Sequence, residues 1–242
     1  MSLYSRHILP RLLDVACAIE PINRQRAKVV PLATGRVVEI GIGSGHNLPH
    51  YDASRVEGLL GIDPDADMWA RSAARRQGLG FPVERLGLSG ESIPLDDASA
   101  DTVVVTYSLC TIPDPVKSLR EMGRILRPDG RLLFVEHGRA PDSAVARWQR
   151  RIDPVWTRLA GGCHTGRDIP VLIREAGLRI ETMEQMYIPG PKVLSYNYWG
   201  TATVARQRAR FSSPVKNVKV GVADRPLAGA SARSMPDGMP PL

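Results

Sequence analysis

The chain has 242 residues, of which 43% are hydrophobic and 24% charged, and it carries a formal net charge of +7. This length and composition suit one soluble domain with appendages, and the apolar runs are shorter than the roughly 20 residues that a membrane-spanning helix needs. Seven Lys or Arg and only two Asp follow residue 205, so most of the positive charge lies near the carboxyl terminus and does not indicate a nucleic-acid-binding domain.

The amino-terminal segment is predicted to form two amphipathic helices, residues 3–19 and 22–31, separated near Pro21. It has neither the short apolar core nor the small-residue cleavage site of a secretory signal. The chain holds three cysteines, whose odd number and wide spacing favour reduced thiols over a disulfide framework or a zinc site. We therefore expect a cytoplasmic protein without a metal site.

Short apolar segments alternate with amphipathic ones through the middle of the chain. Strands are predicted at residues 36–40, 58–62, 83–88, 102–106 and 131–135, with helices between them, notably at 65–76 and 115–126. Continuous apolar runs such as TVVVT and RLLFV are typical of strands buried on both faces. The alternation predicts an α/β fold, in which helices cover both faces of a parallel sheet.

The expected organisation has three parts. Residues 1–33 form a helical cap, and residues 34–211 form the main domain, with a Trp/Arg-rich insertion at about 138–165. Residues 212–242 are rich in Pro, Gly, Ala and Ser and show no sustained period. We interpret them as a solvated tail, with weak attraction to anionic membranes or RNA as the alternative.

The most informative motif is VVEIGIGSGHN, in which a predicted strand containing Glu39 runs directly into the glycine loop, residues 41–45. Such a loop can turn tightly and approach a ligand closely, although glycine clusters also form plain turns. The next strand, GLLGID, ends in Asp63, where a carboxylate can accept hydrogen bonds from both hydroxyls of a ribose. Together the two features indicate a nucleotide-like ligand.

The spacing of the glycines separates two such ligands. NAD-binding proteins have G-x-G-x-x-G, with a helix N-terminus facing a pyrophosphate. Here the glycines read G-x-G-x-G and are followed by His46 and Asn47. This tighter loop, with Glu39 before it, suits a ligand that carries an amino-acid group and no phosphate, which favours S-adenosylmethionine.

From about residue 36 to residue 204 the chain resembles the class I S-adenosylmethionine-dependent methyltransferases. The matching segments are EIGIGSG, GIDPDADM, GESIPLDDASADTVVVTYSLCTIPDP, SLREMGRILRPDGRLLFVEH and YNYWGTAT. The resemblance implies a Rossmann-like seven-stranded sheet whose last two strands, residues 178–187 and 196–204, form an antiparallel hairpin. It also implies S-adenosylmethionine as the cofactor.

The same resemblance implies a set of cofactor-binding residues. The set is Glu39, Gly41, Ile42, Gly43, Gly45, Asn47, Asp63, Pro64, Met68, Ser89, Gly90, Glu91, Tyr107 and Ser108. Glu39 and the glycine loop would hold the methionine end, Asp63 the ribose, and residues 89–91 the edge of the adenine, which Pro64 and Met68 flank. Ser89 stands where many relatives have Asp, which leaves its hydroxyl or a backbone N–H for that contact.

The second half resembles the bacterial relatives of the animal membrane-associated thiol methyltransferases, which share a methyltransferase type 11-like domain. The segments are YSLCTI, FVEH, WQRRIDPVW, the GC at 162–163 and YWG. They imply a small-molecule acceptor, with a thiol or sulfide as the leading hypothesis. Phospholipid N-methylation or ubiquinone/menaquinone-type C-methylation is the alternative, whereas an NAD-dependent oxidoreductase and a non-catalytic cofactor-binding protein are less favoured. The oligomeric state is left open.

Candidate catalytic groups follow the fourth and fifth predicted strands, because ligands of open α/β sheets bind at the carboxyl ends of the strands. His137 is the first candidate, since imidazole accepts a proton near neutral pH; a surface histidine bonded to a loop carbonyl is the alternative. Glu136 either orients His137 or accepts backbone N–H groups, Tyr107 is the third candidate, and Cys110 is interpreted as a pocket-wall residue. A thiol acceptor needs no strong base, because ionising it at pH 7 costs only about 2 kcal/mol.

Two further segments carry open interpretations. In VARWQRRIDPVWTRL, apolar residues recur at helical spacing from Trp148 to Leu159, with an interruption near Pro154. This helix could pack on the core, cover the methyl acceptor together with the amino-terminal helices, or make a peripheral membrane contact.

The other segment is GGCHTGRD. Cys163 and His164 are adjacent in it, so their side chains should point apart, and we expect a turn in place of a catalytic dyad or metal site. Thr165 and Asp168 have the spacing of a capping box before a helix that ends at Gly177. The more specific alternative is that Cys163 or His164 lines the acceptor pocket.

Overall fold

The computed structural model describes residues 8–205 of the chain. Two helices come first, α1 (Leu9–Cys17) and α2 (Glu20–Val29). The predicted tail and the first residues of the first predicted helix lie outside the described range. Within residues 8–205, no helix combines the length and the apolar composition needed to cross a bilayer.

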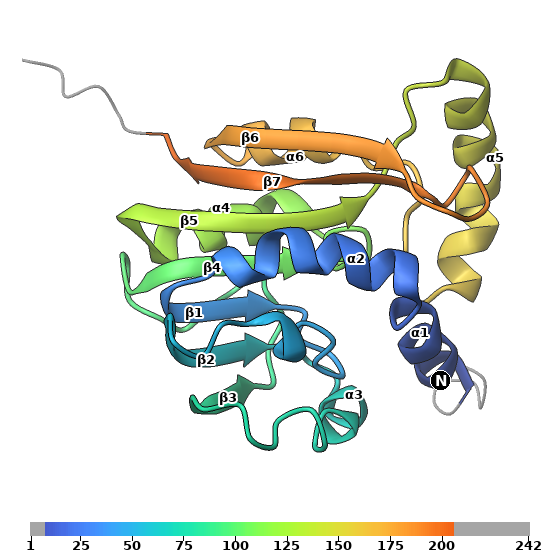
Figure 1. Cartoon of the computed structure of the whole chain (residues 1–242). Coiled ribbons are helices and arrows are strands. Elements are labelled where there is room, and N and C mark those ends of the chain that lie inside the picture. The colour runs from blue at the N-terminus through green and yellow to red at the C-terminus, as the bar shows by residue number, and fades with distance from the viewer. Residues whose placement is uncertain (1–7, 206–242) are drawn as a thin grey trace, which may run out of the picture. The chain divides into compact units, whose positions relative to one another are not determined.

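Seven strands form one sheet in the order β3-β2-β1-β4-β5-β7-β6 (Figure 1). They are β1 (Gly35–Ile40), β2 (Val56–Ile62), β3 (Val83–Leu86), β4 (Ala100–Thr106), β5 (Leu126–His137), β6 (Leu178–Tyr187) and β7 (Tyr196–Val204). The first five strands run parallel, whereas β7 is antiparallel to both of its neighbours. The predicted class I methyltransferase sheet and its final hairpin are confirmed.

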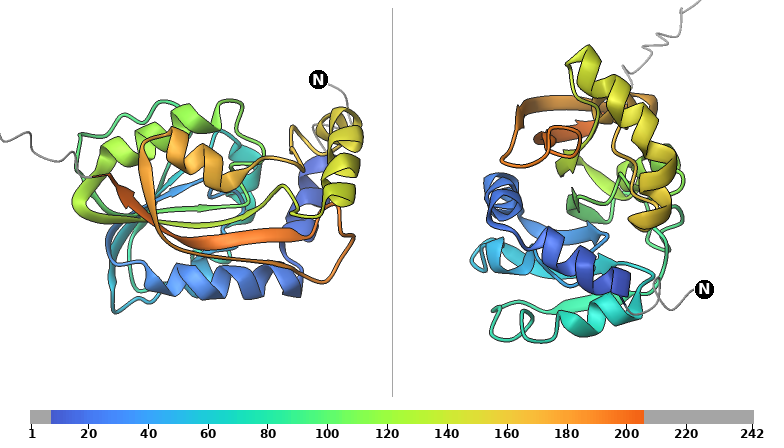
Figure 2. Two further views of the ribbon diagram at one scale, coloured as in Figure 1. Left: turned by 90° about the horizontal axis from the view of Figure 1, so that it is seen from above. Right: turned by 90° about the vertical axis from the view of Figure 1, so that its right-hand side faces the viewer.

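Helices cover both faces of this sheet (Figure 2). The remaining helices are α3 (Ala66–Arg71), α4 (Pro115–Ile125), α5 (Ser143–Leu159) and α6 (Ile169–Glu175). Alternate residues of β4 divide the core: Val103 and Val105 pack on the side of α4 and α6, and Val104 packs on the side of α2. Because β4 is apolar on both faces, it lies at the centre of the sheet.

The helix α5 continues through Pro154, so the predicted interruption at this residue is wrong. Polar contacts hold the helix on both sides of the proline. Upstream, the Gln149 amide donates to the carbonyls of Gly138 (3.0 Å) and Thr165 (2.9 Å). Downstream, Thr157 Oγ1 donates to the carbonyl of Asp153 at 2.9 Å. The helix is thus anchored on both sides of a residue whose nitrogen cannot donate a hydrogen bond.

Candidate active site

The glycine loop lies at the carboxyl edge of the sheet and touches the loop after β4. Gly41 has a φ of +73°, and a β-carbon there would lie 2.1 Å from Ser108 Oγ. Its N–H donates to the carbonyl of Ile62, at the end of β2, at 2.7 Å. Only glycine fits this conformation and this approach, so the predicted loop joins the ends of β1, β2 and β4.

Asp63 closes the other side of the loop. Its Oδ2 accepts the N–H of Gly43 and its Oδ1 accepts the N–H of Asp65, both at 2.8 Å. Burial raises the pKa of this carboxyl even though the two hydrogen bonds oppose the effect. Each oxygen keeps a lone pair for a further donor, as the hydroxyls of a ribose would require. Met68 lies on the same side of Gly43, and Pro64 is exposed.

A buried polar cluster supports the loop from below. Glu39 accepts hydrogen bonds from Asn47 Nδ2 (3.0 Å) and the Tyr51 hydroxyl (2.7 Å). Burial raises the pKa of Glu39 to about 7. Both carboxylate oxygens are thus bonded within the protein, and Glu39 acts on the loop through Asn47. A direct contact between Glu39 and the methionine end of a cofactor stays a prediction.

Arg26 is the residue that the sequence analysis missed. From α2 it donates through Nη1 to Asn47 Oδ1 (2.8 Å) and Thr106 Oγ1 (2.5 Å), and its guanidinium lies 5.0 Å from the centre of the Tyr107 ring. Its buried Nε has no hydrogen-bond partner among the described residues. A buried guanidinium with a free N–H suits an anionic group. One pattern could have indicated Arg26: it lies three residues before Val29 and therefore on the buried face of α2.

The segment after β3 is braced internally. Ser89 Oγ donates to Glu91 Oε2 at 2.6 Å, and Glu91 Oε1 accepts the N–H of Asp114 at 2.7 Å. A β-carbon on Gly90 would lie 2.7 Å from Ile40, the last residue of β1. The predicted adenine-edge residues therefore adjoin the end of β1, with the Glu91 carboxylate bonded to the residue that caps α4.

Tyr107 and Glu136 lie at the carboxyl ends of the neighbouring strands β4 and β5. Tyr107 has a φ of +53°, a strained value for a bulky residue, and its hydroxyl donates to Asn197 Oδ1 at 2.6 Å. Burial raises the pKa of this phenol above its ordinary value. Glu136 Oε1 accepts the N–H groups of Ser108 (2.8 Å) and Leu109 (2.9 Å), and burial raises its pKa to about 7. Glu136 thus holds the loop after β4 by accepting two backbone N–H groups, which is one of the two roles predicted for it.

His137 is the last residue of β5, and its ring stacks on Tyr107 with the ring centres 6.5 Å apart. Its Nε2 lies 3.2 Å from Cys163 Sγ, and its buried Nδ1 has no partner among the described residues. Burial by itself lowers the pKa of His137, but Cys163 and the Glu136 carboxylate outweigh burial and raise it. The alternative of a surface histidine bonded to a loop carbonyl is wrong, because Nε2 contacts the Cys163 thiol and Nδ1 is buried.

Cys163 and His164 point apart, as expected for neighbours in a loop. His164 Nδ1 contacts Asp153 Oδ2 at 2.7 Å, whereas Cys163 meets His137 and Cys110. A hydrogen bond to Cys110 and burial together raise the pKa of the Cys163 thiol. Cys110, His137 and Cys163 therefore form a cluster. The sequence did not reveal it, because Cys163 lies 26 residues beyond His137.

The predicted capping box is wrong in one of its members. Asp168 caps α6 by accepting the N–H of Val171, but Thr165 does not contact it. Asp153 Oδ1 accepts the Thr165 N–H at 2.7 Å and lies 3.1 Å from its hydroxyl. Because a long-range partner occupies Thr165, this residue anchors the loop to α5. The helix α6 ends before Gly177, as predicted.

The predicted apolar stripe of α5 is only partly buried. Ala146 and Gln149 are the buried residues of this helix, whereas Trp148 is 56% exposed, with Arg151 5.5 Å from its ring centre. The prediction that the whole stripe packs on the core is therefore wrong. The inner face of α5 is instead defined by Gln149, whose side chain is fully hydrogen-bonded. The end of α5 adjoins α1: a β-carbon on Gly161 would lie 3.3 Å from Leu9 (Figure 2).

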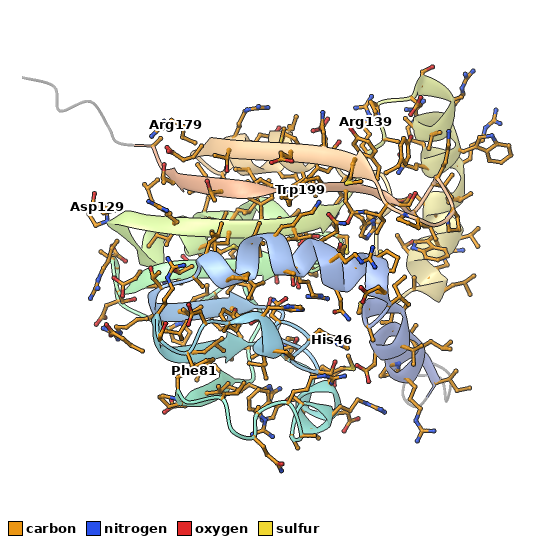
Figure 3. The ribbon with its side chains drawn as sticks, in the orientation of Figure 1. His46, Phe81, Asp129, Arg139, Arg179 and Trp199 are labelled. Carbon is orange, nitrogen blue, oxygen red and sulfur yellow. The ribbon has the colours of Figure 1, made fainter. Side chains whose placement is uncertain are left out.

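The helix α1 is attached to the glycine loop. Asp14 accepts a hydrogen bond from Ser44 Oγ at 2.6 Å and lies 2.9 Å from His46 Nε2. Figure 3 shows His46 on the side of the loop that faces α1. The amino-terminal helices therefore contribute directly to the candidate site, through Asp14 and Arg26.

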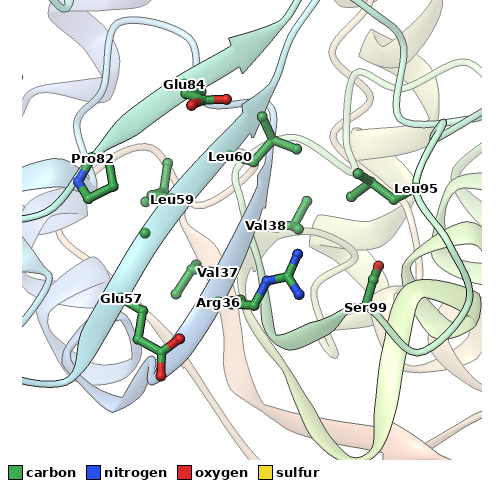
Figure 4. Close-up of a pocket in the computed structure, with 11 residues that line it drawn as sticks. Arg36, Val37, Val38, Glu57, Leu59, Leu60, Pro82, Glu84, Leu95 and Ser99 are labelled. Carbon is green, nitrogen blue, oxygen red and sulfur yellow. The ribbon is translucent and has the colours of Figure 1, made fainter.

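A cavity of about 420 Å³ lies elsewhere, against β1, β2 and β3 (Figure 4). Its lining includes Arg36, Glu57, Leu60 and Leu95, and it contains none of the predicted site residues. It begins at the amino ends of β1 and β2, whereas open α/β sheets bind ligands at the carboxyl ends. We therefore assign the candidate site to the carboxyl edge.

Residues 38–134 match a family described as a methyltransferase domain. A phosphatidylethanolamine N-methyltransferase from Cereibacter sphaeroides is 30% identical over 171 residues, which cover 69% of this chain and 80% of that protein. The chain belongs to the class I S-adenosylmethionine-dependent methyltransferases.

Two further comparisons place this methyltransferase. The thiol S-methyltransferase TMT1B of Rattus norvegicus is 34% identical over 134 residues, which cover 54% of this chain and 55% of that protein. The chain thus spans about half the length of this relative. A solved S-adenosylmethionine-dependent methyltransferase from Methanosarcina mazei matches the fold, with a TM-score of 0.56 and 21% identity over 70% of this chain and 93% of that chain.

The described residues fit S-adenosylmethionine. The carboxyl edge offers a carboxylate for two hydroxyls at Asp63, a buried guanidinium with a free N–H at Arg26, and a loop in which Gly41 leaves no room for a β-carbon. These groups complement the ribose, the α-carboxylate and the close-lying backbone contacts of that cofactor. Arg26, which the predicted set lacks, is a candidate cation for its methionine end.

Proposed function

We propose that this methyltransferase transfers a methyl group to the sulfur of a small thiol. The observation that carries the proposal is His137, whose buried Nδ1 has no partner among the described residues and whose other nitrogen lies beside Cys163 at the end of β5. Thiol and aromatic side chains gathered around this imidazole suit a soft, weakly hydrated acceptor. The thiol S-methyltransferases among the relatives support the same acceptor class.

The chain's own residues would divide the work. Bound S-adenosylmethionine supplies a methyl group activated on a sulfonium. Asp63 binds the ribose hydroxyls and Arg26 the α-carboxylate, which fixes the direction of the methyl group. His137 accepts the proton of the acceptor thiol at Nδ1, while Glu136 and Tyr107 hold the loop and the ring against which it stacks. Exclusion of water by α1 and α5 favours a step in which a thiolate and a sulfonium lose their charges together.

A phospholipid amine is the second candidate acceptor. The apolar side chains Leu12, Val15 and Val155 on α1 and α5 are all more than half exposed, and Arg151 accompanies Trp148 on α5. Exposed aromatic, aliphatic and cationic groups on neighbouring helices suit a peripheral contact with an anionic membrane. The relationship to a phosphatidylethanolamine N-methyltransferase supports this candidate.

One experiment separates the two acceptors. The full chain is incubated with methyl-labelled S-adenosylmethionine and, separately, an alkyl thiol, sulfide, a quinol precursor and vesicles containing phosphatidylethanolamine. We expect label in the thiol product and its loss in His137→Gln, with Asp63→Ala as the control that cannot use the cofactor. Label only in lipid or quinol would reject the thiol proposal.

A further inference from the structure

Three metal-binding side chains converge at the acceptor end of the pocket. Cys110 follows β4, His137 ends β5, and Cys163 lies between α5 and α6. Their ligand atoms all lie within 4.8 Å of one another, and His137 Nε2 lies 3.2 Å from Cys163 Sγ. A tetrahedral Zn²⁺ site sets sulfur and nitrogen donors about 3.5–4 Å apart. The observed cluster is therefore within small side-chain movements of that geometry.

The segments that carry these donors are held in place by bonds that do not involve the donors themselves. Arg167 donates to the carbonyls of Leu109 and Ile112, on either side of Cys110. Asp153 accepts the N–H of Thr165, next to the segment of Cys163. His137 is fixed by its pairing with Asn197 across β5 and β7. Such a preorganised frame is what a metal site requires.

The other contacts of the cluster are weak. Cys110 Sγ lies 3.6 Å from the carbonyl of Tyr107 and 3.5 Å from Thr111 Oγ1. Two thiolates and one imidazole would neutralise Zn²⁺ without a further counter-ion, and binding would release the two thiol protons to solvent. Three protein ligands leave the fourth tetrahedral position open.

We propose that Cys110, His137 and Cys163 form a binding site for Zn²⁺ at the acceptor end of the pocket. Metal on Nε2 leaves the hydrogen of His137 on Nδ1, so the ring cannot also accept a proton there. Zinc binding would therefore remove His137 as the acceptor of the thiol proton. This second consequence rests on the proposed function, whereas metal binding itself does not.

Metal binding is tested without cofactor or acceptor. The reduced, chelator-stripped full chain is titrated with ZnCl₂ against a chromophoric chelator. We expect one high-affinity Zn²⁺ per chain, and a loss of affinity of about 100-fold in Cys110→Ser and in Cys163→Ser. Cys17→Ser is the matched control, because it removes the one cysteine outside the cluster and should change affinity by less than about twofold. Unchanged affinity in both cluster variants would overturn the site.

A measurement on the unmodified chain covers the case in which a variant fails to fold. Saturating Zn²⁺ should slow iodoacetamide labelling of Cys110 and Cys163 by about tenfold or more while leaving Cys17 unaffected, as read by mass spectrometry of peptides. Equal labelling with and without zinc contradicts the site.

Turnover then tests the link to function. We expect the zinc-loaded protein to bind S-adenosylmethionine normally and to methylate a thiol at least about tenfold more slowly. Full turnover with the site saturated would refute the loss of His137 as the proton acceptor. A chain that binds zinc through this cluster but methylates no thiol would instead count against the proposed function alone.

Discussion

The proposed cofactor half and the proposed acceptor half of the site differ in how their acidic and imidazole side chains are bonded. After β1 and β2, both oxygens of Glu39 and both oxygens of Asp63 already accept hydrogen bonds from the protein. After β5, Glu136 Oε2 and His137 Nδ1 are buried without a partner among the described residues. Preformed bonding suits carboxylates that must hold one fixed ligand, and in that half Arg26 Nε is the buried donor left for the ligand itself. Unused donors and acceptors suit a half in which a proton moves.

The strongest test of this division is Asp63→Ala. We expect at least about a 100-fold loss of cofactor affinity by calorimetry, because two charge-assisted hydrogen bonds and the support of Gly43 disappear together. Asp67→Ala, in the first turn of α3, is the control and should bind normally. Normal cofactor binding by Asp63→Ala would show that the cofactor does not bind at this edge of the sheet.

The acceptor half is probed by His137→Gln. Its turnover should fall about 100-fold, since general-base catalysis contributes on that order, while cofactor affinity changes by less than about twofold. A fall in kcat with cofactor binding intact keeps the two halves distinct. If affinity drops as far as it does in Asp63→Ala, the proposed separation fails.

A smaller effect is expected where the two halves touch. Gly41→Ala places a β-carbon 2.1 Å from Ser108 Oγ at a φ of +73°, whereas Gly78→Ala has nearly the same φ (+72°) and nothing within 4 Å. Gly78→Ala should cost about 1 kcal/mol of unfolding free energy from the backbone alone, and Gly41→Ala about 2–3 kcal/mol in chemical denaturation. Equal losses of unfolding free energy in the two variants would mean that the glycine loop and the loop after β4 are not in tight contact.

The last test concerns pH. The pKa of Glu39 is raised by burial to about 7, so the folded chain holds a proton that the unfolded chain loses near pH 4.5. This contribution to stability is complete below pH 4.5 and is lost as the pH rises through 7, by about 3 kcal/mol. Glu39→Gln should flatten the unfolding free energy across this interval. The same slope in wild type and variant would show that Glu39 ionises normally.

The cofactor half could be predicted from sequence because its signals are local. The glycines of the loop and Asp63 at the next strand end are close in the chain, and the strand pattern fixed where that edge lies. For the acceptor half the sequence supplied His137, Cys110 and Cys163 as separate candidates, but not their cluster, because they meet only through the sheet order and the course of α5. Arg26 escaped notice for the same reason, since its partner Thr106 lies 80 residues away.

The bonds of Arg26 bear on where the chain could be shortened. A protein beginning at residue 34, the first residue of the predicted main domain, would retain all seven strands. It would also leave Asn47 and Thr106 without their common donor, and the buried carboxyls of Glu39 and Glu136 without a nearby cation. We therefore expect the minimal functional unit to include α2, and a truncation at residue 34 to remove part of the proposed cofactor site.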